Sequence, residues 1–299
     1  MRRRTTFLSW LVFSAALGAA GLCSAALWAA EPLPIARLAQ VSFRVGDLEK
    51  ARQFYGTIMG FAEAFPIKDA QGQPGGRSFQ VNDDQFLAFL PGAEKEGEFR
   101  LERVSLLTPD IQQARQMLQQ RKVPCGEIHK EADGNPHFSF ADPDGTRFEF
   151  VQYMPGSPQL AARGKSNGAR QVAEHLQHVG LAVADQAVAL GFYRDQLGFW
   201  ETKRGGPTPG DIRWINQMMP GTHGDYVELM VHAAEPVLRR HHLCFGVADI
   251  QRAYKLLLEH GQPPRFKPFV GVTGDSFINL RDPNGIRVEF MEVKKEAGK

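Results

Sequence analysis

The hydrophobic residues of this chain fall into short alternating runs, each followed by an aspartate and then by a segment with helical periodicity. The first run is LAQVSFRV, and Asp47 and the segment LEKARQFYGTIMG come shortly after it. Alternation with a period of two predicts a strand with one buried face. The aspartate is a favourable N-cap for the helix that follows. Gly60, Gly198 and Gly261 stand where three of these helices are expected to end.

The same pattern recurs four times along the chain. Residues 38–61 match residues 176–199, and residues 102–123 open in the same way as residues 241–261. In every copy an aspartate stands seven positions after one particular strand residue. These pairs are Gln40 with Asp47, Arg103 with Asp110, His178 with Asp185 and His242 with Asp249. The repeat predicts four copies of one module that consists of a strand, a helix and about three further strands.

Two modules make one half of the chain, because FADPDGTRFEF (140–150) matches LRDPNGIRVEF (280–290) at the end of each half. We expect an N-terminal domain over residues 35–153 and a C-terminal domain over residues 173–293. Residues 154–172 are rich in Pro, Gly, Ser and Lys without periodicity, which predicts a linker.

The first 30 residues form a separate segment. Arg2, Arg3 and Arg4 precede a run without charge that extends from Phe7 to about Ala30, which is typical of a secretory signal peptide. The run is also long enough for an uncleaved N-terminal anchor. We expect an exported protein, periplasmic or secreted. Without this segment only Cys125 and Cys244 remain, in different halves, so we expect no disulfide framework.

The overall charge argues for a small-molecule substrate. The chain has 35 Lys and Arg against 33 Asp and Glu, and this near balance predicts neither a nucleic-acid partner nor binding to a membrane surface unless the N-terminal segment stays attached. We expect a monomer or a homodimer.

Candidate chemistry appears when equivalent positions of the modules are compared. In the C-terminal half these positions are His178, Glu228, His242 and Glu289, and in the N-terminal half they are Gln40, about Ala88, Arg103 and Glu149. Two imidazoles with one or two carboxylates suit a divalent transition metal, whereas an arginine would repel one. We therefore expect a single divalent ion (Zn, Ni, Fe(II) or Mn) in the C-terminal half, a degenerate site in the N-terminal half and no organic cofactor.

The remaining candidates are expected to play smaller parts. His241 should point to the face opposite His242, where it is exposed or supports the ligands from behind. Cys244 shares the face of His242, and we expect a small core residue there in preference to a pocket-lining one. The other histidines of this half are expected in loops or at helix ends, away from the substrate: His175, His223, His232 and His260.

These modules resemble the βαβββ unit of the vicinal oxygen chelate superfamily, which includes glyoxalase I, methylmalonyl-CoA epimerase, bleomycin-resistance proteins and extradiol ring-cleaving dioxygenases. The opening signature of glyoxalase I, His or Gln before a strand and then a helix with Phe-Tyr and Gly-Phe, is met by residues 40–61 and 178–199. The resemblance covers about residues 35–293. It implies an α+β fold in which four βαβββ modules pair into two half-open barrel domains.

The resemblance leaves three functions open, since one scaffold carries many chemistries. A metal-dependent isomerase, lyase or epimerase would use all four ligands, with Glu228 or Glu289 as the catalytic group that moves a proton. An Fe(II) extradiol dioxygenase would use His178, His242 and Glu289 alone. However, residues 268–289 lack the His and Tyr of that signature, and Asn279 stands where the Tyr is expected. The third function is non-catalytic binding of a small molecule.

Overall fold

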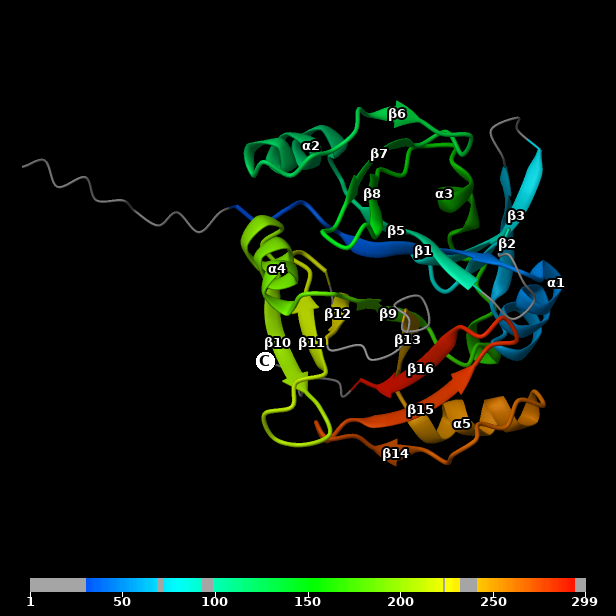
Figure 1. Cartoon of the computed structure of the whole chain (residues 1–299). Helices are drawn as coiled ribbons and strands as arrows, with labels where there is room; N and C mark the ends of the chain where they lie inside the picture. Colours follow the sequence, from blue (N-terminus) through cyan, green and yellow to red (C-terminus); the bar gives the residue numbers. More distant parts are fainter. Residues whose placement is uncertain (1–30, 69–72, 93–98, 223, 232–240, 294–299) are drawn as a thin grey trace, which may run out of the picture. The chain divides into compact units, whose positions relative to one another are not determined.

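The computed structural model describes residues 31–68, 73–92, 99–222, 224–231 and 241–293. The predicted signal segment, residues 1–30, lies outside this part of the chain, as do His223 and His232. The described residues form two eight-stranded sheets, one from each half of the chain. In Figure 1 the sheet with β6, β7 and β8 lies in the upper part of the view and the sheet with β14, β15 and β16 in the lower part. Within this part of the chain, no helix is both long and apolar enough to span a bilayer.

Each half contains two successive modules. The strands of the N-terminal half are β1 (Arg37–Val45), β2 (Ala62–Lys68), β3 (Pro74–Gln80), β4 (Phe86–Pro91), β5 (Phe99–Leu107), β6 (His129–Lys130), β7 (Pro136–Ala141) and β8 (Arg147–Val151). Those of the C-terminal half are β9 (His175–Ala182), β10 (Trp200–Gly205), β11 (Trp214–Met218), β12 (Tyr226–Met230), β13 (His242–Val247), β14 (Phe269–Val270), β15 (Ser276–Arg281) and β16 (Arg287–Glu292).

The helices follow the first strand of each module, as the pattern predicted. They are α1 (Leu48–Ala51) with the π-helix η1 (Arg52–Ile58), α2 (Ile111–Gln120), α4 (Gln186–Leu190) with the π-helix η3 (Gly191–Gln196), and α5 (Ile250–Glu259). All four predicted aspartates are N-caps whose side chains accept hydrogen bonds from backbone N–H groups of the first turn. Gly60, Gly198 and Gly261 have positive φ angles of 74°, 75° and 78°, which suits the residue after a helix.

The two modules of a half join through their first strands. In the N-terminal sheet β1 pairs antiparallel with β5, and each of them pairs parallel with the last strand of its own module. The strand order is β2-β3-β4-β1-β5-β8-β7-β6, and the C-terminal sheet repeats it as β10-β11-β12-β9-β13-β16-β15-β14. Four βαβββ modules thus pair into two half-open barrels of an α+β protein, and the predicted fold class is confirmed.

The second module contacts the third, and the fourth contacts the first, so both contacts join the two halves of the chain. Asp142, in the last turn of the second module, accepts a hydrogen bond of 2.7 Å from Tyr193 Oη in the third module. Two residues further along the same turn, Asp144 Oδ1 accepts a hydrogen bond of 3.0 Å from Ala184 N–H in the third module, and its counterpart Asn284 Oδ1 accepts one of 3.2 Å from Asp47 N–H in the first. Phe61 and Phe245 also pack together, with ring centroids 5.4 Å apart. The repeat symmetry therefore extends to the contacts between the halves.

The segment predicted as an irregular linker, residues 154–172, contains the short helix α3 (Pro158–Ala162) and a 3₁₀ turn η2 (Gly168–Arg170). It packs against the N-terminal half, since Gln80 Nε2 donates to the carbonyl of Ala162 at 2.8 Å and Gln171 Nε2 to that of Val81 at 3.0 Å. Five helical residues are too few to show periodicity in the sequence.

Candidate metal centre

The four predicted ligand positions lie on four neighbouring strands, and the strand register places them on one face of the C-terminal sheet. Gly180 of β9 pairs with Glu228 of β12 on one side and with His242 of β13 on the other. His178 lies two residues before Gly180 and so shares its face. Cys244 pairs with both His178 and Glu289, which brings Glu289 of β16 to the same face.

The ligand atoms converge on one point. His178 Nε2 and His242 Nε2 are 3.3 Å apart, and His242 Nε2 lies 3.5 Å from Glu228 Oε1 and 3.8 Å from Glu289 Oε2. Glu228 Oε2 lies 3.9 Å from His178 Nε2. An ion bonded to each atom at about 2.1 Å holds adjacent ligand atoms roughly 3 to 3.5 Å apart. The arrangement therefore fits a divalent metal after small side-chain movements.

Gly180 makes room for this arrangement. The imidazole of His242 lies directly over the Gly180 backbone, and a Cβ atom at that position would overlap the ring. Because the two residues are register partners, the ring can reach the centre of the cluster only where its neighbour has no side chain.

Burial prepares the side chains for a cation. His178 is 1% exposed and His242 is fully buried. Burial, together with the neighbouring His242, lowers the pKa of His178 well below its usual value, which leaves the imidazole neutral and able to bind a metal. Burial also raises the pKa of Glu228 to about 8, and the nearby Glu289 carboxylate adds to this effect. A divalent ion would supply the positive charge that two adjacent buried carboxylates require.

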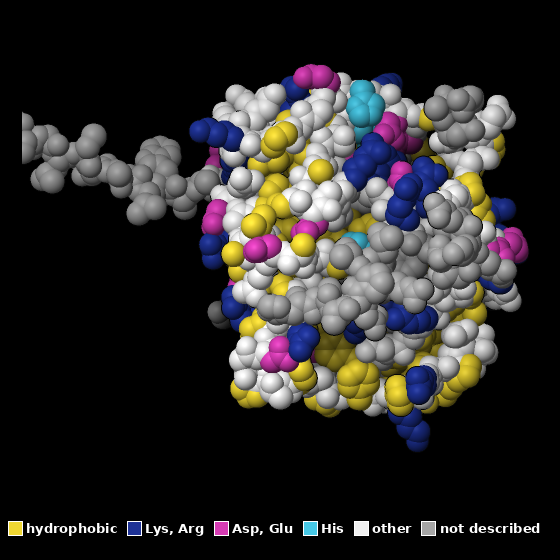
Figure 2. Space-filling view, in the orientation of Figure 1, with side chains coloured by type: hydrophobic (Ala, Val, Ile, Leu, Met, Phe, Trp, Pro, Cys, Tyr) yellow, Lys and Arg dark blue, Asp and Glu magenta, His cyan; other side chains and the backbone are white. Residues whose placement is uncertain are grey.

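The cluster borders a cavity of about 350 Å³ with mixed walls. Its apolar lining includes Trp214, Met218, Tyr226, Met230, Phe277 and Met291. Arg287 also lines it and pairs with Glu289, and Asn279 donates to Glu289 Oε1 at 3.3 Å when its amide nitrogen faces that oxygen. From the sequence, Asn279 was considered only as the residue that stands where a Tyr is expected, and Arg287 was not singled out. In Figure 2 hydrophobic side chains line a hollow in the lower part of the molecule, where Figure 1 places the C-terminal sheet.

Several secondary expectations can be compared with the structure. Cys244 is fully buried, and its Sγ lies within 4.8 Å of ligand atoms of His178 and Glu289, so this core residue also adjoins the metal site. His241 is only 6% exposed, which excludes the expectation that it faces solvent, and burial lowers its pKa to about 4. His175 is not in a loop but begins β9, where its Nε2 donates to Asp225 Oδ1 at 2.6 Å. His260 is the C-cap of α5, at a helix end as expected.

The N-terminal half presents the same register with different side chains. Arg103 and Ala88 both pair with Ser42, as His242 and Glu228 pair with Gly180. Arg103 Nη1 donates to Glu149 Oε2, the counterpart of Glu289, at 2.8 Å. A guanidinium therefore takes the place of a metal ligand and pairs with the carboxylate.

Sequence reasoning missed four residues around Arg103: Ser105, Glu131, Asp133 and His137. Ser105 Oγ donates to Glu149 Oε1 at 2.5 Å, and Arg103 Nη1 donates to Glu131 Oε1 at 3.1 Å. The alternation of His137 and Ser139 ahead of the DPDG turn was the available signal, because it gives β7 a polar face beside Glu149.

Comparison with solved structures finds chains that share this fold. The 2,3-dioxygenase LapB from Pseudomonas sp. KL28 matches with a TM-score of 0.68 at 16% identity, over 89% of this chain and 94% of that chain. A homoprotocatechuate 2,3-dioxygenase variant from Brevibacterium fuscum matches with a TM-score of 0.67 at 20% identity, over 90% and 74%. The Mn(II)-bound glyoxalase from Novosphingobium aromaticivorans matches with a TM-score of 0.67 at 15% identity, over 87% and 82%. Identities this low show a shared fold.

Sequence comparison identifies the family. The Bacillus subtilis (strain 168) protein named "Uncharacterized protein YurT" is 36% identical over 90 residues, which amount to 26% of this chain and 68% of that protein. The model of the Glyoxalase/Bleomycin resistance protein/Dioxygenase superfamily matches residues 37–150 and again residues 175–290. Both halves of the fold are thus covered, and this chain belongs to the Glyoxalase/Bleomycin resistance protein/Dioxygenase superfamily.

Proposed function

We propose that this chain is an exported enzyme that binds one divalent metal through His178, Glu228, His242 and Glu289 and acts as an isomerase, lyase or epimerase. Its substrate would be a small molecule that chelates the metal through two oxygens. The observation that carries the proposal is the place of Glu228, whose carboxylate lies 3.5 Å from His242 Nε2 and also lines the cavity. A three-ligand site does not need this residue.

The protein's own groups have separate tasks in this mechanism. The metal, when bound, supplies Lewis-acid stabilisation of an oxyanion on the substrate. Glu228 is placed to take a proton from the carbon next to the chelated carbonyl and to return it, because the same carboxylate adjoins the ligands and the cavity. Met218, Met230 and Phe277 form apolar walls that hold the substrate and exclude water.

A second candidate is an Fe(II) ring-cleaving dioxygenase that uses His178, His242 and Glu289. The shared two-sheet fold of the 2,3-dioxygenases supports it, since LapB is matched over 94% of its chain. Against it, Asn279 of β15 is the register partner of Glu289 of β16, at the place where a Tyr is expected. Residues 268–289 contain neither His nor Tyr. Non-catalytic binding of a small molecule is the third candidate.

One set of assays separates the three candidates. The mature protein would be loaded in turn with Zn, Ni, Mn or Fe(II) and incubated with α-hydroxy ketone adducts in D₂O, with proton exchange followed by NMR. We expect exchange at the carbon next to the carbonyl, and its loss in Glu228→Gln. Oxygen uptake coupled to the loss of a catechol would instead support the dioxygenase, and binding without either reaction would support the third candidate.

Export is part of the proposal and has its own test. Three arginines before an uncharged run of more than 20 residues support processing by the export machinery. Mass spectrometry of the protein from its native host should find a chain that begins near residue 31 outside the cytoplasm. An intact Met1 in a soluble cytoplasmic fraction would exclude export, and an intact Met1 in the membrane fraction would indicate an anchor.

A further inference from the structure

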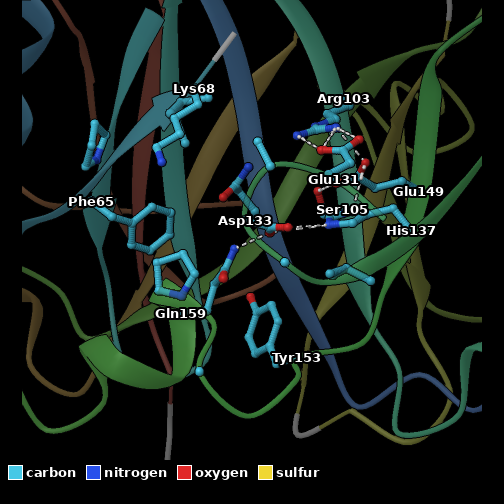
Figure 3. Close-up of a pocket in the computed structure, with 18 residues that line it drawn as sticks. Phe65, Lys68, Arg103, Ser105, Glu131, Asp133, His137, Glu149, Tyr153 and Gln159 are labelled. Atoms are coloured by element: carbon cyan, nitrogen blue, oxygen red, sulfur yellow. Dashed lines mark hydrogen bonds and ion pairs between the residues drawn. The ribbon is translucent and has the colours of Figure 1, made fainter. Parts of the chain in front are cut away.

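The N-terminal half contains a cavity of about 420 Å³ that the proposed reaction does not use. Its volume lies within the range of about 300 to 1,000 Å³ that is usual for small-molecule sites. Figure 3 shows its two sides: Phe65 and Lys68 of β2 lie opposite a cluster formed by Arg103, Glu131, His137 and Glu149. The cavity thus lies where the C-terminal half holds the metal centre, on the equivalent face of the equivalent sheet.

Hydrogen bonds fix the polar wall before any ligand binds. Arg103 Nη1 donates to Glu149 at 2.8 Å and to Glu131 at 3.1 Å. His137 has a side chain that is 4% exposed, and its Nε2 lies 3.2 Å from Asp133 Oδ1 and its Nδ1 3.5 Å from Glu149 Oε2. Such a network holds its members in place, which is what a preorganised binding wall requires.

This wall does not suit a metal, although ligand atoms of Glu131, His137 and Glu149 lie within 4.8 Å of one another. Both nitrogens of His137 face carboxylates, Nε2 at hydrogen-bond distance from Asp133 and Nδ1 at ion-pair distance from Glu149. This setting favours the doubly protonated imidazole, which has no lone pair for an ion. Burial alone would lower the pKa of His137, but Asp133 and Glu149 outweigh it and raise the pKa to about 9. Arg103 adds a fixed positive charge at the centre of the cluster.

The charges that line the cavity balance. Three carboxylates, those of Glu131, Asp133 and Glu149, face the charged Arg103 and His137, and Lys68 supplies the third positive charge from across the cavity. A ligand with a net charge would disturb this balance inside a partly desolvated site, so an uncharged ligand is favoured.

The lining also offers hydrogen bonds of both kinds next to an apolar surface. Among the described residues, Arg103 Nε–H and one Nη2–H have no acceptor, whereas the carboxylates retain lone pairs. Phe65 and Tyr153 provide aromatic faces on which a ring can pack. A hydroxyl group both donates and accepts hydrogen bonds. Two hydroxyls on neighbouring carbons can therefore accept from the guanidinium and donate to a carboxylate at the same time.

We propose that this cavity is a second, metal-independent binding site for an uncharged ring compound with at least two neighbouring hydroxyl groups. A phenolic diol and a sugar share this chemistry. The inference does not rest on the function proposed for the metal centre, because it involves the other half of the chain.

Calorimetric titration of the mature chain after metal removal with EDTA tests the inference. Catechol and methyl glucoside serve as the two neutral probes, and benzoate and benzylamine as charged ones. We expect saturable binding of at least one neutral probe, unchanged by chelation, and at least tenfold weaker binding of either charged probe. A preference for catechol identifies the phenolic source and a preference for the glucoside identifies the sugar.

Variants assign the binding to the N-terminal cavity. Phe65→Ala and Glu131→Gln should each weaken the neutral probe at least tenfold, while Phe277→Ala, a matched change in the C-terminal cavity, should leave it unchanged. The side chains of Phe65 and Glu131 are partly exposed, and circular dichroism verifies that these variants fold. Absence of binding by both neutral probes, preference for a charged probe, or loss of binding in Phe277→Ala but not in Phe65→Ala would overturn the proposal.

Discussion

Arg103 and His242 occupy equivalent positions in the two halves of this protein. Arg103 pairs across the sheet with Ser42, two residues after Gln40, and His242 pairs with Gly180, two residues after His178. One side chain is a fixed cation and the other is the imidazole of a predicted metal ligand. Each adjoins the same partner on the last strand, Glu149 or Glu289. In the N-terminal half Arg103 pairs with this buried carboxylate, whereas in the C-terminal half Arg287 pairs with it from the same strand and the predicted divalent ion would supply further positive charge.

The first prediction concerns metal content. The mature chain, purified without chelator, should contain one divalent ion by inductively coupled plasma mass spectrometry. His242→Ala should contain none, because the imidazole lies within 3.8 Å of three other predicted ligands. His137→Gln, which removes a buried histidine from the N-terminal half, should retain the ion. Two ions per wild-type chain would contradict the expected asymmetry.

The second prediction concerns the fourth ligand. Glu228→Gln is nearly isosteric but removes the charge, so we expect metal affinity to fall by at least ~10-fold, the effect typical even of residues that only support a ligand. Competition with a fluorescent chelator measures this change. Glu201→Gln on the edge strand β10, which β11 separates from β12, serves as the control and should bind normally. Equal affinity of both variants would favour the three-ligand centre.

The third prediction concerns the pH dependence of stability. The pKa of His137 is about 9 in the folded protein and about 6.5 in an unfolded chain. A raised pKa stabilises the folded state fully below pH ~6.5, and this contribution is lost as the pH rises through ~9. Its size is roughly 2 to 4 kcal/mol. Urea unfolding of the metal-free protein at several pH values should show this decline in the wild type.

The same series in His137→Gln provides the comparison. The variant is expected to be less stable at neutral pH, since Asp133 and Glu149 lose their partner, but its free energy of unfolding should change less between pH 6.5 and 9. Parallel curves for the two proteins would show that His137 is not charged in the folded state.

The fourth prediction concerns the contact between the second and third modules. Tyr193 is fully buried and Asp142 is 5% exposed, and the hydrogen bond between them is 2.7 Å long. Tyr193→Phe leaves a buried carboxylate oxygen without its donor, so we expect the free energy of unfolding to fall by about 1 to 3 kcal/mol. Tyr254→Phe on α5 should change it by less than about 0.5 kcal/mol. Thermal or urea unfolding measures both.

Local chemistry and repetition made much of the fold predictable. An aspartate such as Asp185 signals a helix start through bonds to its own first turn, and these bonds do not depend on the rest of the molecule. Repeat symmetry then identified equivalent positions, and equivalent positions on paired strands meet on one face. For this reason His178, His242 and Glu289 could be grouped from sequence although more than 100 residues separate the first from the last.

Other features depend on contacts that no repeat marks. Asp133 and Glu131 lie in the turn before β7, where their counterparts in the other half are Thr273 and Gly271, so comparison of the halves does not single them out. The π-helical turns after α1 and α4 share the apolar spacing of ordinary helices, and the sequence predicts a helix without showing its winding. The burial of His241 likewise depends on packing around β13 that alternation alone does not specify.

The bare backbone at Gly180 has a consequence for any attempt to build the metal ligand set into the N-terminal half. The N-terminal half carries Ser42 at this position, where its buried hydroxyl accepts a hydrogen bond from Gln40. An imidazole at Arg103 in the pose of His242 would collide with that side chain, so a single mutation at Arg103 restores nothing. Ser42, Gln40 and Ala88 would have to change as well, and each change alone would disturb a packed interior without providing a ligand set. A metal site in the N-terminal half would therefore need several simultaneous substitutions, so the two cavities are chemically separate and a single substitution does not interconvert them.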